Sequence, residues 1–305
     1  MADYFVEFKK LTVLLMVAGF VLYVFFPAPF LREVLNYIVF TAVIISLPFT
    51  GRGSAAVCLV LFGTGFYLIK VSGNGWQFCL EAMGKNISLL ALVITVPLLG
   101  IPLKSGGYVR VLDDLAAKYM GSRRRMYLVP ALFSHVLGVF MNIGAVPLTH
   151  EITGRGRVNG YPGILARSIS RGFGAALMWS PNMIATAVVL GYLGVAWQDY
   201  VKLGILFAAI SLFLGFATDF LNRERGIEGQ DSRGGLQQNR RIDRKKMGEL
   251  VATAVIFLSV VIFIETGTSL KVIDIVPVMS LVFPVVWLIM LGLKHKVNES
   301  YKEYF

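Results

Sequence analysis

Long apolar blocks separated by short polar stretches run along almost the whole chain. A helix that crosses the hydrocarbon core of a bilayer needs roughly 20 predominantly apolar residues. The blocks are continuous, unlike the alternating or one-faced patterns of soluble strands and helices. The sequence therefore predicts an all-α polytopic membrane protein with about eight transmembrane helices. These helices are expected at residues 11–29, 34–50, 54–72, 86–103, 166–196, 199–221, 249–265 and 272–293.

The apolar stretch 126–153 differs from the other blocks because helix breakers and polar side chains interrupt it. Irregular backbone at membrane depth survives only where protein buries it or where it lines a cavity. Two short helices meeting at Met141-Asn142-Ile143-Gly144 would form a re-entrant hairpin whose tip reaches about mid-bilayer. The alternative is a single kinked span whose asparagine bonds to a neighbouring helix. The interrupting residues are Pro130, Ser134, His135, Gly138, Asn142, Gly144, Pro147 and Thr149.

The distribution of basic residues favours the hairpin, because cytoplasmic loops of membrane proteins carry an excess of Lys and Arg. With a cytoplasmic N-terminus and a re-entrant hairpin, 24 of the 29 basic residues lie on the cytoplasmic side. A full crossing by 126–153 would instead place the basic loop 222–248 outside. We therefore expect a bacterial-type cytoplasmic (inner) membrane protein with both termini in the cytoplasm.

Composition narrows the function classes. The chain is 56% hydrophobic and 15% charged, whereas soluble domains carry about 25% charged residues. The net charge of +11 follows membrane topology, so no nucleic-acid partner is expected. Cys58 and Cys79 provide neither a disulfide framework nor metal-ligand spacing. Nucleotide-binding and hydrolase motifs and paired intramembrane carboxylates are absent, so we expect no enzyme activity and no cofactor.

The segment Arg167–Trp197 contains a second interruption, at Ser180-Pro181-Asn182. Pro181 lacks an N–H and clashes with the carbonyl four residues earlier, so the helix should kink or unwind there. The freed carbonyls and the neighbouring polar side chains would offer oxygen ligands suited to Na⁺. The N-terminus of the resumed half-helix would suit an anionic group. The alternative is an ordinary proline kink in a packed bundle.

The remaining polar segments and side chains are expected to have structural roles. Residues 107–120 would form a helix with one apolar face and one charged face. This pattern indicates a helix lying in the membrane interface or an ordinary amphipathic connector. Residues 222–248 form a basic linker without apolar periodicity. His135 is expected to pack and hydrogen-bond inside the hairpin. Hydration at the membrane surface is expected to account for Glu265 and Asp274.

The order of these elements resembles the N-terminal half of the ion transporter superfamily, which includes divalent anion/sodium symporters and arsenite-permease-like carriers. The likeness covers about residues 34–222 and rests on an interfacial helix, a hairpin with Asn142-Ile143-Gly144-Ala145 at its tip, and the break at Ser180-Pro181-Asn182. It implies that the hairpin tip and the broken helix together hold a coupling cation and one side of an anionic substrate. The site residues so implied are Asn142, Gly144, Ser180, Pro181, Asn182 and Thr186, with Na⁺ as the candidate cation near Asn142 and Asn182.

The same resemblance implies that the chain has three parts. Residues 1–222 would form a first transport repeat, 223–248 a linker, and 249–305 two spans of an incomplete second repeat. The missing half would come from a separate polypeptide or a second copy, or the carrier is truncated. The expected function is secondary transport, by a whole transporter or one half, of a small anionic solute coupled to Na⁺ or H⁺. The alternative is a non-transporting membrane subunit or scaffold of a larger complex.

Overall fold

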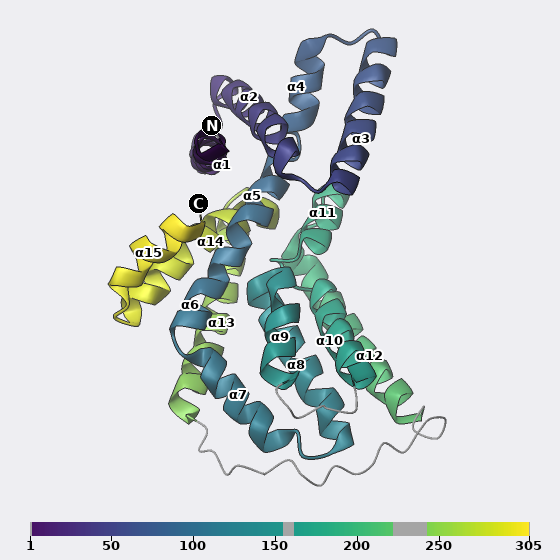
Figure 1. Cartoon of the computed structure of the whole chain (residues 1–305), viewed down its shortest axis with the longest axis vertical. Coiled ribbons are helices and arrows are strands. Elements are labelled where there is room, and N and C mark those ends of the chain that lie inside the picture. The colour runs from purple at the N-terminus through teal and green to yellow at the C-terminus, as the bar shows by residue number, and fades with distance from the viewer. Residues whose placement is uncertain (1, 155–161, 222–242, 305) are drawn as a thin grey trace. The chain divides into compact units, whose positions relative to one another are not determined.

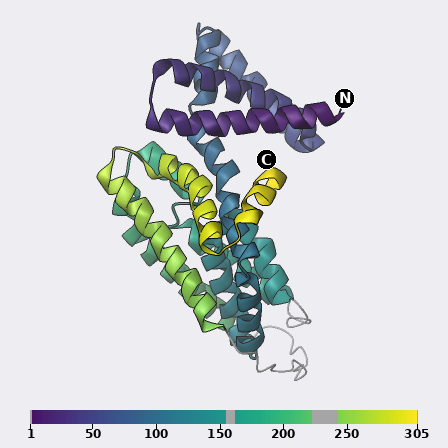
Figure 2. The ribbon, with the colours of Figure 1, turned by 90° about the vertical axis from the view of Figure 1, so that its left-hand side faces the viewer.

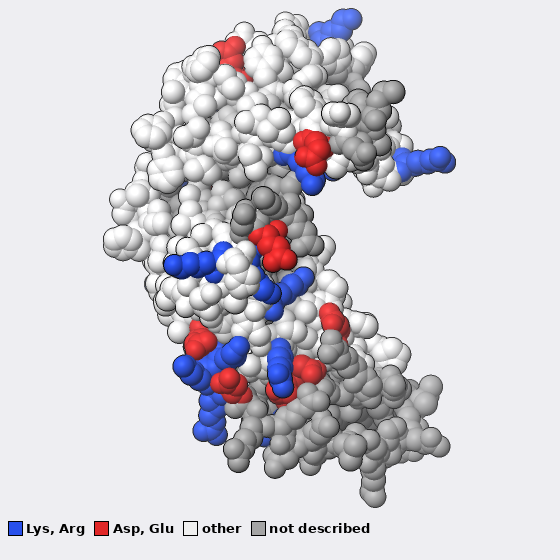
Figure 3. Space-filling view, turned by 60° about the vertical axis from the view of Figure 1, so that its left-hand side comes forward, with Lys and Arg blue, Asp and Glu red and all other residues white. Residues whose placement is uncertain are grey.

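The computed structural model describes residues 2–154, 162–221 and 243–304. Across these ranges every regular element is a helix (Figure 1). Eight continuous helical stretches there are long and apolar enough to cross a bilayer. Broad areas of the face in Figure 3 carry no charged side chain, as contact with lipid requires. The prediction of an all-α polytopic membrane protein is therefore confirmed.

The chain forms two compact units, Met1–Ala91 with Tyr301–Phe305, and Leu92–Ser300. In the first unit α1 packs on α2 and α2 packs on α4. The buried Asn36 of α2 lies against Gly84, where an added Cβ would come within 1.6 Å of the Asn36 side-chain oxygen. None of the residues of α3 is buried. The elements of this part are α1 (Ala2–Phe25), α2 (Pro29–Ser46), η1 (Leu47–Phe49), α3 (Arg52–Val71), α4 (Trp76–Gly84) and α5 (Ile87–Thr95), which continues into the second unit.

The second unit contains the hairpin and the broken helix. α13 and α14 lie side by side in it (Figures 1 and 2). Its elements are η2 (Val96–Leu99), α6 (Gly100–Ser105), α7 (Tyr108–Tyr119), α8 (Arg123–Met141), η3 (Asn142–Gly144), α9 (Ala145–Gly154), α10 (Pro162–Leu177), α11 (Ile184–Leu193), α12 (Trp197–Leu221), α13 (Arg244–Gly267), α14 (Val272–Met290) and α15 (Lys294–Tyr304), whose last residues belong to the first unit.

The stretch 126–153 folds as the predicted hairpin. α8 and α9 pack against each other, and the short helix η3 reverses the chain between them (Figure 1). One of the eight apolar stretches, Arg124–Gly154, is therefore folded back on itself. α10 ends at Leu177 and α11 begins at Ile184, so the interruption predicted at Ser180-Pro181-Asn182 is present and starts two residues earlier than expected.

α8 and α10 approach each other closely. A Cβ added at Gly172 of α10 would lie 2.0 Å from the carbonyl oxygen of Ala131 on α8. The Ser134 hydroxyl donates to the Ile169 carbonyl at 2.9 Å across the same interface. The hairpin is thus fixed to the first half of the broken helix by backbone proximity that only glycine permits.

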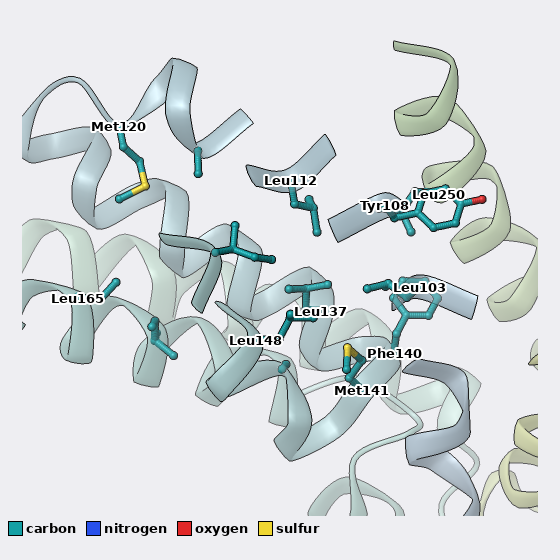
Figure 4. Close-up of a cluster of buried hydrophobic side chains, with 14 of the residues drawn as sticks. Leu103, Tyr108, Leu112, Met120, Leu137, Phe140, Met141, Leu148, Leu165 and Leu250 are labelled. Atoms are coloured by element: carbon teal, nitrogen blue, oxygen red, sulfur yellow. The ribbon is translucent and has the colours of Figure 1, made fainter. Parts of the chain in front are cut away.

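The amphipathic helix predicted at 107–120 is α7. Its buried residues are Tyr108, Val111, Leu112 and Ala116. Tyr108, Leu112 and Ala116 join an apolar cluster with residues of α8, α9, α13 and α14 (Figure 4). The Lys246 side chain of α13 donates to the Gly106 carbonyl at 2.8 Å, just before α7 begins. α7 is therefore anchored to the rest of this unit along its apolar face.

Several predicted boundaries are wrong. The fourth span, expected as one helix over 86–103, is interrupted at Val96–Leu99, where Pro97 disrupts regular α-helix. The linker was expected over 222–248, but α13 already begins at Arg244. The Asp243 side chain caps that helix by accepting from the Lys246 backbone N–H at 3.1 Å. Residues 222–242 lie outside the described part of the chain.

Replacing Gly172 with alanine is expected to destabilise the second unit, because the new methyl group would overlap the Ala131 carbonyl. Overpacking of this kind costs about 1–3 kcal/mol. Gly174→Ala is the matched control, since an added Cβ there meets no atom within 4 Å. Thermal unfolding in detergent should show a lower Tm for Gly172→Ala alone. Equal Tm values for the two variants would contradict the close contact of α8 and α10.

Candidate functional site

The hairpin tip is held in a strained backbone conformation. Asn142 has φ 50 and ψ −133, and it is the one non-glycine residue with positive φ among those described. Such conformations cost of order 1–3 kcal/mol and persist only where surrounding contacts enforce them. The Asn142 side-chain amide donates to the Asn182 carbonyl at 3.0 Å. The strained tip is therefore bonded directly to the break in the neighbouring helix.

Asn182 completes a reciprocal pair of contacts. Its side-chain amide donates to the Val139 carbonyl, one turn before the hairpin tip, at 2.5 Å. Its backbone N–H contacts the Ser180 hydroxyl at 3.4 Å. Asn182 is 0% exposed, and its side-chain oxygen has no hydrogen-bond partner among the described residues. That oxygen is the free acceptor of the candidate site, because a buried acceptor without a partner is uncommon.

The carbonyls freed by the break each accept a hydrogen bond from a side chain, which the sequence does not predict. The Met178 carbonyl accepts from the Tyr200 hydroxyl at 2.7 Å, and the Trp179 carbonyl accepts from the Trp197 indole at 2.7 Å. The Leu177 carbonyl accepts from the Thr186 hydroxyl. Side chains of α11 and α12 thus replace the helical hydrogen bonds that the break removes.

His135 links the hairpin to the break. Its Nε2 atom accepts from the Trp179 indole N–H at 3.2 Å, and the two ring centroids are 6.0 Å apart. The sequence predicted that the hydrogen-bond partner of His135 would lie inside the hairpin. That prediction is wrong, because the partner, Trp179, belongs to the broken helix.

A third interruption escaped the sequence interpretation. The turn η2 lies beside the hairpin tip and against α14. A Cβ added at Gly100, directly after η2, would lie 2.9 Å from the Met141 methyl group. On α14, Ser280 is buried without a hydrogen-bond partner, between Pro277 and Pro284. Pro97 and Gly100 are the residues from which the sequence could have predicted this interruption.

The structure brings most of the predicted site residues together. Asn142, Ser180, Pro181 and Asn182 meet where the hairpin tip contacts the break. Thr186 turns back toward Leu177, away from that contact. Gly144 is not sterically required, because a Cβ there would only reach ordinary contact with Met141 at 3.7 Å.

The donor set of the site is made of amide, hydroxyl and carbonyl oxygens. Within the described ranges, no three His, Cys, Asp or Glu side chains gather as a metal would require. Hard cations such as Na⁺ accept neutral oxygen ligands, so the residues fit that ion and not a transition metal. Ser180 and Asn182 are both 0% exposed, so an ion could reach them only after a movement of the surrounding elements.

The end of α13 holds a buried carboxylate. Glu265 is 9% exposed and accepts from the backbone N–H groups of Trp197 and Gln198, at 3.0 and 3.2 Å. It caps the first turn of α12, where a negative charge is stabilised by the helix dipole. It also lines a pocket of 220 Å³ together with Lys271. The expectation that hydration accounts for Glu265 is therefore wrong.

Comparison with known proteins adds no assignment, since no family model, curated protein or solved structure matches the chain.

Glu265→Ala should destabilise the second unit by about 1–3 kcal/mol, because two buried backbone N–H groups of α12 would lose their acceptor. Glu265→Gln keeps one acceptor oxygen and should cost less. The control is Asp199→Asn, an exposed acid in the same first turn, for which a change within about 0.5 kcal/mol is expected. Unfolding midpoints measured in detergent decide the order. An alanine variant as stable as the Asp199 control would refute the capping role.

Proposed function

We propose that this protein is a secondary active transporter, or one half of one, that moves a small anionic solute together with Na⁺ or H⁺. The proposal rests on a re-entrant hairpin and a broken helix that meet at membrane depth. Discontinuous helices are the usual means by which secondary transporters build binding sites inside the bilayer. The likeness to the ion transporter superfamily noted from the sequence agrees with it.

One observation carries the proposal. Asn142 donates to the backbone of the break, and Asn182 of the break donates to the backbone of the hairpin. Both bonds join the hairpin to the break. Movement of either element alone would therefore break them. Secondary transporters typically form their binding sites from irregular segments of this kind.

The chemistry at the break supports a cation and an anion side by side. The free Asn182 side-chain oxygen is suited to Na⁺. α11 begins directly after the break, and no side chain caps its first turn. Its N-terminal N–H groups therefore remain directed at the break, where they favour a negatively charged solute group.

A second polypeptide or a second copy would complete the site. Ile143 at the hairpin tip is 73% exposed although the tip lies at the end of an apolar hairpin. In the proposed transporter that side chain faces the complementary half. The scaffold alternative shares this exposed tip but gives no role to the unpartnered oxygen of Asn182.

Asn142→Ala combined with Asn182→Ala tests the site. Purified protein in proteoliposomes would be screened against inorganic and organic anions with and without a Na⁺ or pH gradient. Each lost hydrogen bond weakens the site by about 1 kcal/mol, so uptake at low solute concentration should fall about tenfold or more. Asn36→Ala is the control, because Asn36 is a buried membrane asparagine of the first unit.

Unchanged uptake in the double variant would refute the proposed site. Absence of uptake for every anion, by the chain alone and by the chain together with a complementary polypeptide, would favour the scaffold function.

A further inference from the structure

We propose that His135 binds a proton that releases the helix break, so that H⁺ acts on the site through the His135–Trp179 contact. This inference rests on the proposed transport function for its biological role and names the coupling ion. Its physical basis is the hydrogen bond from the Trp179 indole N–H to His135 Nε2 at 3.2 Å.

The protonation state of His135 follows from the chemistry of its partner. Indole nitrogen is a donor only, so His135 Nε2 must carry a lone pair when this bond exists. The neutral imidazole then holds its proton on Nδ1. A second proton, added at Nε2, produces an imidazolium with two donors and no acceptor. Proton binding and the bond to Trp179 are therefore mutually exclusive.

Loss of the His135–Trp179 bond on protonation would loosen the break, because Trp179 lies at its start. Trp179 directly precedes Ser180-Pro181-Asn182, and its carbonyl is held by the Trp197 indole. Asn182 returns to the hairpin at Val139, one helical turn beyond His135. The break is thus clamped to α8 at both of its ends, and protonation removes one clamp.

The charged groups of α10, the helix in closest contact with α8, are bonded to α12. Arg167 of α10 pairs with Asp219 of α12 at 2.8 Å, and Arg171 bonds to the Thr218 hydroxyl at 2.9 Å. Arg171 also lies beside Tyr127 of α8 around Gly215. Tyr127 is eight residues before His135, or about 12 Å along the helix. Arg167 and Arg171 are thus engaged with α12.

The other elements packed against α8 carry further titratable groups. On α9 the His150 ring lies beside Gly154 and is exposed. Tyr200 of α12 donates its hydroxyl to the Met178 carbonyl. η2 and η3 contain no titratable residue. The remaining titratable residues of α7, α8, α9 and α12 are Tyr108, Arg110, Asp113, Asp114, Lys118, Tyr119, Arg123, Arg124, Arg125, Glu151, Asp199 and Lys202.

Unlike the amide and hydroxyl groups at the break, imidazole can bind a proton on the ring nitrogen that carries no hydrogen. Of the chain's three histidines, His135, His150 and His295, the first is the one bonded to the break. The other two therefore serve as matched controls.

Hydrogen–deuterium exchange of the full-length protein in lipid nanodiscs tests the proposal. The probe is the proton alone, and the readout is exchange of the backbone amides of 178–183, corrected for intrinsic pH effects with an unstructured peptide. The amides of Trp179, Ser180 and Met183 are hydrogen-bonded in the structure. Lowering the pH from 8 to 5 should accelerate their exchange about five- to tenfold.

Two variants should lock opposite states. His135→Gln keeps an acceptor that does not titrate, so exchange should stay slow at both pH values. Trp179→Phe removes the donor, so exchange should be fast at both. His150→Gln and His295→Gln should retain the wild-type response.

A wild-type protein without a pH response, or a His135→Gln variant that keeps the full response, would overturn the proton site. The readout needs no solute, so this result is independent of the uptake experiment. A pH switch at His135 without any transport would instead leave the proton site standing and refute the proposed transport function.

Discussion

Backbone hydrogen bonding inside the bilayer is the constraint on which this structure depends. No water is available there, so a helix that breaks must find other donors for its carbonyls. Thr186, Tyr200 and Trp197 supply donors for three consecutive carbonyls, those of residues 177, 178 and 179. The Asn142 amide supplies the donor for residue 182. The break therefore has hydrogen-bond donors for the carbonyls of residues 177, 178, 179 and 182, and it is not a relaxed kink.

These donors come from different elements, and that explains why the site is closed. The resumed helix α11, the following helix α12 and the hairpin each hold part of the break. Movement at any one contact leaves a buried carbonyl without a donor, at a cost of about 1–3 kcal/mol. Separation of these elements therefore requires that each released carbonyl find another donor.

The sequence was sufficient to locate the irregular segments but not their partners. Pro181 marks the break, and Asn142 with the surrounding prolines, glycines and basic loops marks the hairpin. Trp197 and Tyr200 carried no such signal, because both stand at the start of an ordinary apolar helix. Their role depends on contacts across 18 and 22 residues of chain that only the fold defines. Glu265 was misread for the same reason, since its partners lie 67 and 68 residues away.

The central claim is that the hairpin tip and the helix break form one hydrogen-bonded unit within the membrane. Solid-state NMR on bilayer-embedded protein, labelled with ¹⁵N at the Asn142 side chain and ¹³C at the Asn182 carbonyl, measures that contact directly. The 3.0 Å separation of the Asn142 nitrogen and the Asn182 oxygen corresponds to a nitrogen–carbon distance of about 4 Å. A measured distance near this value is the expected result. A distance beyond about 6 Å would leave no hydrogen bond between tip and break and would contradict the account.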